Sequence, residues 1–358
     1  MNRRWTTYLG LDRFSVIYLF AAFVIIFGIW TPQEFLTAAS FHAVATEQAV
    51  SGMLAIAVLI PLTCGQFDLS VGATANLTGI VAILLQANLH WSVGLAVVAS
   101  VAVGVLAGAV NGFLVVRLRI SSFIATLAMG SVLSAVLLIV TGSQQPPAVV
   151  SSAWSDLTQY SIFGLQIVVY YLLVLALIAW WFLAHTPFGR YMYATGGNAE
   201  AARLSGVNVS LWSWSSLILS GGIAGLGGVF FTSQTGPSLV FGSTLLLPAF
   251  AAAFLGSTQL HPGRFNVWGT ILAIYVLATG VQGLELVSGQ QWLSDMFNGV
   301  ALAVAVALAV NRERRSRRGS TPVVEVPPDV AATPDDYTDQ AETVAPTAGL
   351  TSTGQEEA

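Results

Sequence analysis

The chain has 358 residues, of which 55% are hydrophobic and only 8% charged, and its formal net charge is −4. Soluble domains carry about 25% charged residues, so this composition excludes an ordinary soluble protein and indicates a polytopic membrane protein. All thirteen basic residues are arginine. Without lysine the chain has no phosphate-binding Walker A motif, so any ATP that drives it must bind to another chain.

Ten apolar runs account for most of the sequence. A helix needs about 20 mostly apolar residues to cross the hydrocarbon core, and all runs except the eighth approach that length. We therefore expect an all-α polytopic membrane protein with about ten transmembrane helices over residues 14–310. The first run exceeds the apolar core of a signal peptide, about 7–15 residues, and is interpreted as a retained span. The runs are at about 14–30, 45–63, 70–87, 92–116, 121–141, 166–184, 211–232, 244–258, 265–284 and 292–310.

The arginines indicate the orientation of these spans. Cytoplasmic loops carry an excess of Lys and Arg. With ten spans and a cytoplasmic N-terminus, every arginine falls on the cytoplasmic side, whereas dropping a single span would split them between the two sides. We therefore expect both termini in the cytoplasm. The arginines are Arg3, Arg4, Arg13, Arg117, Arg119, Arg190, Arg203, Arg264, Arg312, Arg314, Arg315, Arg317 and Arg318.

The two ends of the sequence differ in composition from the spans. Residues 1–13 are expected to form a short cytoplasmic N-terminus. Residues 311–358 begin with an arginine cluster and continue with eight acidic residues, no basic residues and many Pro, Thr and Ala. A segment of this kind cannot bury an apolar core, so we expect a disordered acidic cytoplasmic tail.

The most informative segment is polar and lies between two spans, at residues 186–210. It contains a predicted short helix at 198–204. Asn198 is a suitable N-cap, Glu200 favours the positive N-terminal end of the helix, and Gly206 suits a left-handed exit. A small capped helix isolated between membrane spans needs a partner to pack against, so we interpret this loop as a docking element.

A second segment, residues 63–72, interrupts the apolar pattern. Pro61, Gly65 and Gly72 surround Asp68, which predicts a broken helix. Breaks at membrane depth are tolerated only where the backbone is buried in protein or lines a water-filled cavity. Asp68 can serve as a structural cap or ion-pair member, or contact a transported solute directly, and both interpretations stay open.

The two halves of the chain resemble each other weakly. Val-Asn-Gly at 110–112 matches Val-Gln-Gly at 281–283, and the glycine pattern at 65–74 matches the one at 236–244. Both matches are offset by about 170 residues. Transporters are often built from internal repeats with the pathway at their interface. The offset predicts a half repeat in which spans two to five correspond to spans seven to ten.

Other sequence features give no sign of a catalytic or metal centre. The single cysteine, Cys64, excludes a cysteine-based zinc site and a disulfide framework, and is best interpreted as a packed side chain. The four histidines are scattered with no neighbour at metal-ligand spacing. Many of the tryptophans fall near span ends, as in the aromatic belts of membrane proteins. No metal site is therefore expected.

Four blocks of sequence resemble the permease subunit of bacterial ABC importers of the ribose, xylose and autoinducer-2 type, in the branched-chain amino acid/ribose permease superfamily. Residues 188–208 resemble the long cytoplasmic loop of that family nearly throughout. The chain departs at Gln66 and Phe67, and at 246–248, where many relatives carry acidic residues; these changes bear on the sugar more than on the subunit type. The other blocks, at 65–72, 262–270 and 280–284, resemble G-G-I-D-L-S-V-G, G-G-R-G-x-x-x-G-T and V-x-N-G-L.

The resemblance implies transport and no enzymatic activity in this chain. Two permease subunits, identical or different, would form the pathway for a sugar, a pentose or a similar solute, across the bacterial plasma (inner) membrane. Separate ATPase subunits carrying ATP-Mg would dock on the cytoplasmic loops. A periplasmic or lipoprotein solute-binding protein would deliver the sugar. The chain itself would bind no cofactor and no nucleic acid, and membrane lipid would surround it.

The resemblance also implies roles for particular residues. Residues 198–204 would form the coupling helix, seated in a cleft of the ATPase, and Arg203 would be able to pair with an acidic residue there. Uncharged polar side chains within the spans suit a neutral sugar. The expected ATPase-coupling residues are Gly189, Arg190, Gly197, Asn198, Glu200, Ala201, Ala202, Arg203 and Gly206. The candidate pathway or structural residues are Gln48, Asp68, Asn76, Asn111 and Gln282.

Three alternatives compete with this hypothesis. An ABC permease for amino acids or nucleosides lies closest to it. A stand-alone secondary transporter would be driven by protons through Glu47 and Asp68, and its uptake would survive loss of any ATPase. An intramembrane enzyme needs converging catalytic residues, and the sequence of the spans contains no Ser/Lys, paired-Asp or His-Glu zinc pattern.

Overall fold

The computed structural model describes residues 11–148, 151–260 and 263–319, and this part of the chain is almost entirely helical. The expected all-α fold is confirmed. Each of the ten apolar runs forms a helix. The predicted disordered tail at 320–358 and the first ten residues lie outside the described residues. The ten helices are α2 (Leu11–Trp30), α4 (Ala38–Thr63), α5 (Val71–Leu89), α6 (Val93–Val116), α7 (Ser122–Thr141), α9 (Ile167–His185), α12 (Val209–Thr235), α13 (Phe241–Ser257), α14 (Val267–Ser288) and α15 (Gln291–Gly319).

Seven of these helices are long and apolar enough to cross a membrane: α4, α5, α6, α7, α9, α12 and α14. The apolar stretches of α2, α13 and α15 are shorter, at Val16–Trp30, Phe241–Ser257 and Trp292–Leu308. The chain is therefore a polytopic helical membrane protein. The number of ten crossings and the cytoplasmic position of both termini stay predictions.

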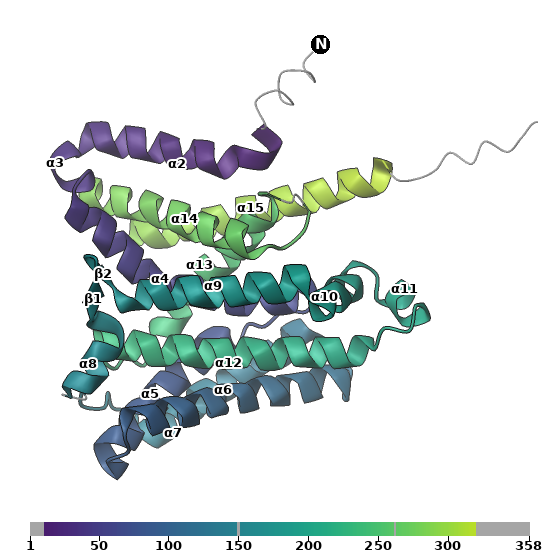
Figure 1. Ribbon diagram of the computed structural model, residues 1–358, viewed down its shortest axis with the longest axis horizontal. Helices are drawn as coiled ribbons and strands as arrows, with labels where there is room; N and C mark the ends of the chain where they lie inside the picture. Colours follow the sequence, from purple (N-terminus) through teal and green to yellow (C-terminus); the bar gives the residue numbers. More distant parts are fainter. Residues whose placement is uncertain (1–10, 149–150, 261–262, 320–358) are drawn as a thin grey trace, which may run out of the picture. The chain divides into compact units, whose positions relative to one another are not determined.

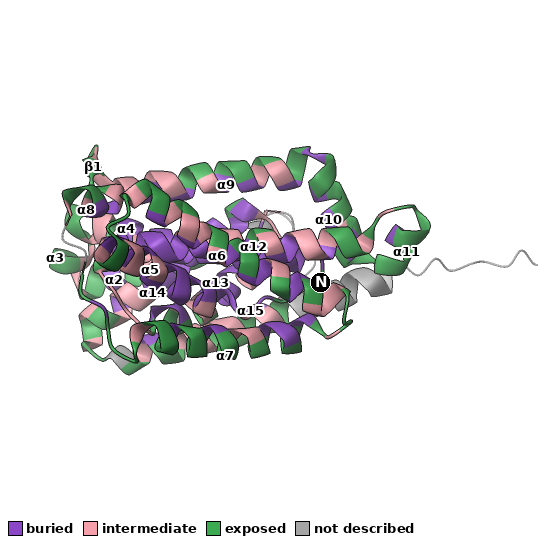
Figure 2. Ribbon diagram, turned by 90° about the horizontal axis from the view of Figure 1, so that it is seen from below, coloured by how far each residue is buried: buried purple, intermediate pink, exposed green. Residues whose placement is uncertain are grey.

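Of the described residues, those from Leu11 to Arg314 belong to one compact unit, and Arg315–Gly319 belong to a second. The first unit is built around α4, in which every residue from 49 to 63 is buried. A helix that is apolar on all sides is stable only when protein or lipid surrounds it. Helices α9, α12, α13 and α14 all pack against α4, and the buried residues lie inside the bundle while the outer helices show exposed faces (Figure 2).

Glycines allow close packing of α12 against its neighbours, as expected from its glycine-rich sequence. A side chain on Gly221 would overlap the carbonyl oxygen of Gly104 in α6. A Cβ atom on Gly79 in α5 would lie only 2.6 Å from the carbonyl oxygen of Gly228. Small residues at such crossings let helix backbones approach closely within a membrane.

Short elements occupy the two ends of the bundle. At one end lie α3 (Pro32–Phe35), α8 (Ser152–Gln159) and an antiparallel hairpin of β1 (Ser161–Ile162) and β2 (Leu165–Gln166), in which Ser161 pairs with Gln166. At the opposite end lie α10 (Pro187–Gly197) and α11 (Ala199–Leu204), which connect α9 to α12 (Figure 1). The polar loop at 186–210 therefore projects from one end of the bundle.

The predicted half repeat has matching local geometry at its glycines. Gly65 follows α4 with φ of 73°, and Gly236 follows α12 with φ of 90°. The shorter helices α5 and α13 then begin, each with a glycine as its second residue. These two glycines, Gly72 and Gly242, meet backbone to backbone, because a side chain on either would overlap the carbonyl oxygen of the other. Equivalent positions of the two halves thus come together inside the bundle.

Candidate functional site

The loop between α9 and α12 begins with a helix that the sequence did not lead us to expect. α10 covers Pro187–Gly197, whereas only 198–204 was predicted as helical. Thr186 caps α10, since its Oγ1 accepts a hydrogen bond from the backbone N–H of Gly189 at 3.4 Å. Pro187 occupies the first turn, where its missing N–H costs no hydrogen bond. This Thr-Pro pair was the available sequence signal for α10.

α10 is held against three membrane helices. Gly189 lies against the end of α9, because a side chain there would overlap the backbone of Leu183. Gly196 lies in the same way against Thr63, the last residue of α4. On the side of α12, the ring of Tyr191 stacks on that of Trp212 with centroids 5.4 Å apart. A movement of α10 would therefore displace residues that contact α9, α4 and α12.

α11 confirms the predicted capped helix. The Oδ1 atom of Asn198 accepts a hydrogen bond from the backbone N–H of Ala201 at 3.0 Å. Glu200 lies in the first turn, near the positive end of the helix dipole. Gly206 ends the segment with φ of 84°, in the left-handed region that favours glycine. The local signals in the sequence were sufficient to define this helix.

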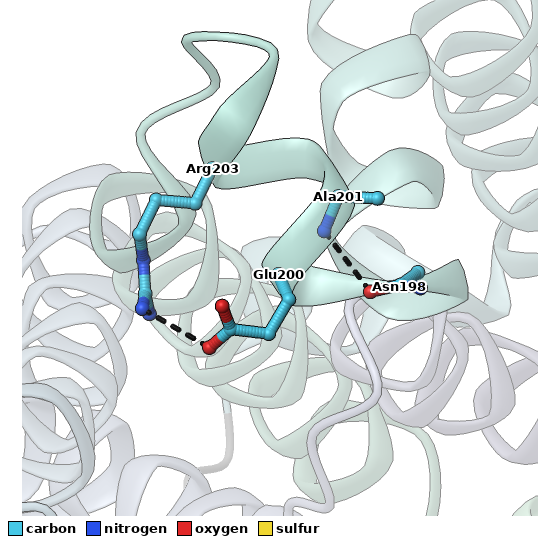
Figure 3. Close-up of polar contacts among 4 residues, drawn as sticks. All are labelled: Asn198, Glu200, Ala201 and Arg203. Carbon is cyan, nitrogen blue, oxygen red and sulfur yellow. Dashed lines mark hydrogen bonds and ion pairs between the residues drawn. The ribbon is translucent and has the colours of Figure 1, made fainter. Parts of the chain in front are cut away.

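α11 projects most of its side chains away from the protein. Arg203 Nη1 donates a hydrogen bond to Glu200 Oε1 at 3.3 Å, and their side chains are 64% and 80% exposed (Figure 3). Leu204 is 88% exposed, while Ala202 is buried. An exposed ion pair contributes only about 0–1 kcal/mol to stability. The exposed side chains of Glu200, Arg203 and Leu204 are therefore accessible to a binding partner. Of the other predicted coupling residues, Arg190 and Gly197 are exposed.

The segment between α4 and α5 holds a buried carboxylate. Asp68 is 1% exposed. Its Oδ1 accepts hydrogen bonds from the backbone N–H of Ser70 at 3.0 Å and from Ser70 Oγ at 2.6 Å, and its Oδ2 accepts one from Ser220 Oγ of α12 at 2.7 Å. Asn111 Nδ2 of α6 donates to Ser70 Oγ at 2.8 Å. Buried charges are costly unless hydrogen-bonded or paired, and these bonds suit a structural role for Asp68.

The same segment is fastened to α7 by two serine and threonine side chains. Ser122 Oγ accepts a hydrogen bond from the backbone N–H of Phe67, and Thr126 Oγ1 accepts one from that of Leu69, both at 3.0 Å. The broken segment therefore satisfies the backbone N–H groups of Phe67 and Leu69 within the protein. Sequence reasoning missed Ser122, Thr126 and Ser220, because hydroxyl side chains within apolar runs carry no distinctive pattern.

The remaining pathway candidates are not gathered at one point. Asn76 of α5 is buried; its Nδ2 donates to the carbonyl oxygen of Leu239 at 3.1 Å, and its Oδ1 accepts from the N–H of Gly242 at 2.8 Å. Asn76 thus joins α5 to the start of α13. Gln48 and Gln282 are half-buried on α4 and α14. A pathway role for any of these residues stays a prediction.

A comparison with protein families decides the class of this chain. Residues 40–306 match the family model described as the permease component of branched-chain amino acid transport systems. The chain belongs to this permease family. The resemblance expected from the four sequence blocks is therefore confirmed, and the permease is a multi-pass protein of the plasma membrane.

Curated relatives of this permease serve several importers. It is 33% identical to the autoinducer 2 import system permease protein LsrC of Salmonella typhimurium over 75% of this chain and 78% of that protein. It is 31% identical to the ribose import permease protein RbsC of Escherichia coli (77% and 86% covered) and 28% identical to the D-allose transport system permease protein AlsC of the same organism (83% and 91%). No solved structure matches the chain significantly.

The titratable residues of the permease form no metal centre in the ranges that the structure describes: no group of three or more His, Cys, Asp or Glu side chains is placed to hold an ion. Cys64 is buried at the end of α4, and its thiol donates to the carbonyl oxygen of Trp212 at 3.7 Å. Burial raises the pKa of Cys64 to about 11. The thiol is therefore neutral at physiological pH, as a packed side chain should be.

Proposed function

We propose that this permease forms the translocation pathway of an ABC importer for a sugar, a pentose or a solute of similar size, powered by a separate ATPase. Two permease subunits would enclose the pathway, and an extracytoplasmic binding protein would deliver the solute. The ribose and allose permeases among the relatives are named for sugars, and the autoinducer 2 permease belongs to an import system. The uncharged side chains of Gln48 and Gln282 suit such a neutral solute.

The observation that carries the ATPase part of the proposal is the form of α10 and α11. α11 is exposed on nearly all sides and carries Glu200, Arg203 and Leu204. α10 instead packs tightly on the bundle through Gly189 and Gly196. A loop that merely joined two spans would need neither the capped, exposed helix α11 nor the tight packing of α10 on the bundle. The pair of helices suits an element that binds a partner and passes the partner's movement to the membrane helices.

The route of that movement follows from contacts at the base of the loop. A shift of α10 would press Gly196 against Thr63 and Gly65 at the end of α4. The adjoining segment ends in Asp68 and Ser70, which bind α12 and α6 by hydrogen bonds. α5 begins immediately afterwards, where Gly72 meets Gly242 of α13. We propose that ATP-driven movement of α10 reaches the junction of the two half-repeats along this chain of contacts.

The test is to replace Glu200 and Arg203 together by alanine and to purify the permease with its ATPase. Because the pair is exposed, the double variant should insert in the membrane and retain its thermal stability. It should bind the ATPase more weakly and lose most solute-stimulated ATP hydrolysis. An Asp156→Ala variant, which changes a charged residue of α8 at the opposite end of the bundle, is the control. Normal assembly and transport by the double variant would refute the docking role of α11.

A further inference from the structure

A cavity lies beside α10, where α9 ends and α14 begins. It has a volume of about 260 Å³. Its wall combines apolar, aromatic and cationic side chains from four parts of the chain, which none of the proposed transport roles explains. Its lining includes Trp180 and Leu183 of α9, Tyr193 of α10, Arg264 and Phe265 of the loop after α13, and Trp268 of α14.

Arg264 supplies a positive charge at a fixed position in this wall. Its guanidinium carbon lies 3.7 Å from the centroid of the Tyr193 ring. The Tyr193 hydroxyl in turn donates a hydrogen bond to the carbonyl oxygen of Phe265 at 2.5 Å, so the ring itself is held in place. The only ion pair within the described ranges joins Arg203 to Glu200, and Arg264 is exposed. Its N–H groups can therefore bind an anion without displacing an acidic partner.

The aromatic side chains around the cavity are of the kind found at the edge of a membrane. Trp180 and Trp268 flank it, with ring centroids 6.4 Å apart, and Trp268 is 36% exposed. Tryptophan is enriched at the level of lipid headgroups. Leu183 and Ala184, from the last turn of α9, add apolar surface next to the charge. A ligand that fits this cavity has a negative group at the interface and an apolar part beside it.

We propose that this cavity binds an anionic phospholipid of the inner leaflet, with the lipid phosphate on the guanidinium of Arg264. Basic pockets between membrane helices on the cytoplasmic side are suited to such headgroups. The proposal rests on the proposed cytoplasmic position of the α10 end of the bundle. Because Tyr193 belongs to α10, the bound lipid would also brace α10, and its loss would loosen the contact between Tyr193 and the backbone of Phe265 in the loop before α14.

The lipid is tested on the permease alone, by native mass spectrometry after release from nanodiscs. The probes are phosphatidylglycerol and phosphatidylcholine of the same acyl chains. We expect the wild-type chain to retain one more lipid molecule in phosphatidylglycerol nanodiscs than in phosphatidylcholine nanodiscs. Equal retention of the two lipids would overturn the proposal, as would displacement of the bound lipid by 10 mM inorganic phosphate, which would assign the site to free phosphate.

Two variants and a control identify the site. Arg264→Gln should lower the affinity for phosphatidylglycerol about fivefold to tenfold, whereas Arg264→Lys should retain most of it because the charge is kept. Arg117→Gln removes another exposed arginine, outside this cavity, and should bind lipid like the wild type. An equal loss in Arg117→Gln and Arg264→Gln would mean non-specific attraction and would overturn the assignment. Since these measurements need neither ATPase nor sugar, they are independent of the proposed transport function.

Discussion

Gly196 of α10 packs backbone to backbone against Thr63, the last residue of α4. α4 is the buried centre of the first unit, and α10 is the base of the exposed helix α11. One close contact therefore joins the proposed docking element to the core of the membrane domain. The contact is possible because Gly196 carries no side chain where it meets the carbonyl oxygen of Thr63.

Replacing Gly196 by alanine should disturb this contact. The new Cβ atom would overlap the carbonyl oxygen of Thr63 and lie 2.9 Å from the backbone nitrogen of Gly65. Since both are backbone atoms, they cannot move aside easily, and overpacking of this kind costs about 1–3 kcal/mol. We expect a lower thermal unfolding temperature in detergent and weaker solute-stimulated ATP hydrolysis in the assembled importer.

The neighbouring glycine provides a matched control for that variant. A Cβ atom on Gly197 would meet no atom within 4 Å. Gly197→Ala should therefore leave the unfolding temperature close to that of the wild type. Because Gly197 is itself an expected coupling residue, Gly94→Ala in α6, where a Cβ atom also meets no atom within 4 Å, is the control for ATP hydrolysis. If Gly196→Ala behaves like these controls in both measurements, the contact with α4 has no role in coupling.

The cap of α11 should matter more than the equivalent cap of α12. Asn198 and Asn208 each accept a hydrogen bond from a backbone N–H three residues later, at 3.0 Å. Loss of such a cap costs about 1 kcal/mol. α11 has six residues and little packing of its own, whereas α12 has 27 residues and is packed on α4, α5 and α6. Asn198→Ala should therefore fray α11, and Asn208→Ala should leave α12 intact.

Hydrogen exchange of the α11 amides measures this difference directly. Exchange should be faster in Asn198→Ala and unchanged in Asn208→Ala, and only the former should bind the ATPase more weakly. Unaltered exchange in α11 after loss of the Asn198 side chain would contradict the account of how this helix is held.

Of the two neighbouring helices α10 and α11, only α11 could be predicted from the sequence. α11 was predicted because Asn198 and Gly206 are local signals that act within a few residues. α10 was missed because Gly189 and Gly196 look unfavourable in a helix, and their role is to allow contact with α9 and α4. That benefit depends on residues such as Thr63, more than a hundred positions away, and tertiary packing then overrides local propensity.

The same reasoning applies to the buried segment around Asp68. The helix break was predicted because proline and glycine act locally on the backbone. The partner of the carboxylate, Ser220, lies 152 residues away in a glycine-rich span, and nothing in its local sequence distinguishes it from neighbouring serines. The apolar pattern predicted all ten long helices, and the polar network between them became visible only from the structure.

Cys64 should react slowly with alkylating reagents in the folded protein. Its pKa of about 11 compares with an ordinary value of 9.0, so at pH 8 the folded protein holds about 100-fold less thiolate than the unfolded chain. Alkylation by iodoacetamide, followed by mass spectrometry, should be at least that much slower before denaturation than after it. Rapid alkylation of the native protein at pH 8 would contradict the burial of this thiol.

The raised pKa of Cys64 also predicts how stability changes with pH. Between about pH 9 and pH 11 the unfolded chain releases the thiol proton of Cys64 while the folded chain keeps it. The free energy of unfolding contributed by this group should therefore be constant below pH 9, decrease as the pH rises to about 11, and level off above that. A Cys64→Ala variant, which has no thiol, should lack this part of the pH dependence.

Because the native Cys64 is buried and unreactive, cysteines introduced at exposed positions can report the orientation of the ten helices. With ten crossings and cytoplasmic termini, the α8 end of the bundle faces outward and α11 faces the cytoplasm. Tyr160→Cys and Leu204→Cys introduce thiols at positions that are 58% and 88% exposed, at opposite ends. A membrane-impermeant maleimide should label position 160 in right-side-out vesicles and position 204 only after the vesicles are opened. Labelling of both positions in sealed vesicles would refute this topology.

The measurement that tests the central claim most directly is solute uptake into proteoliposomes containing the permease, its ATPase and the loaded binding protein. We predict that solute uptake requires ATP on the side of the membrane that carries the ATPase, opposite the binding protein. Uptake should persist when a protonophore collapses the proton gradient, and it should be lost when Glu200 and Arg203 are both replaced by alanine. Uptake by the permease alone, without ATP and dependent on the proton gradient, would contradict the claim and identify a secondary transporter.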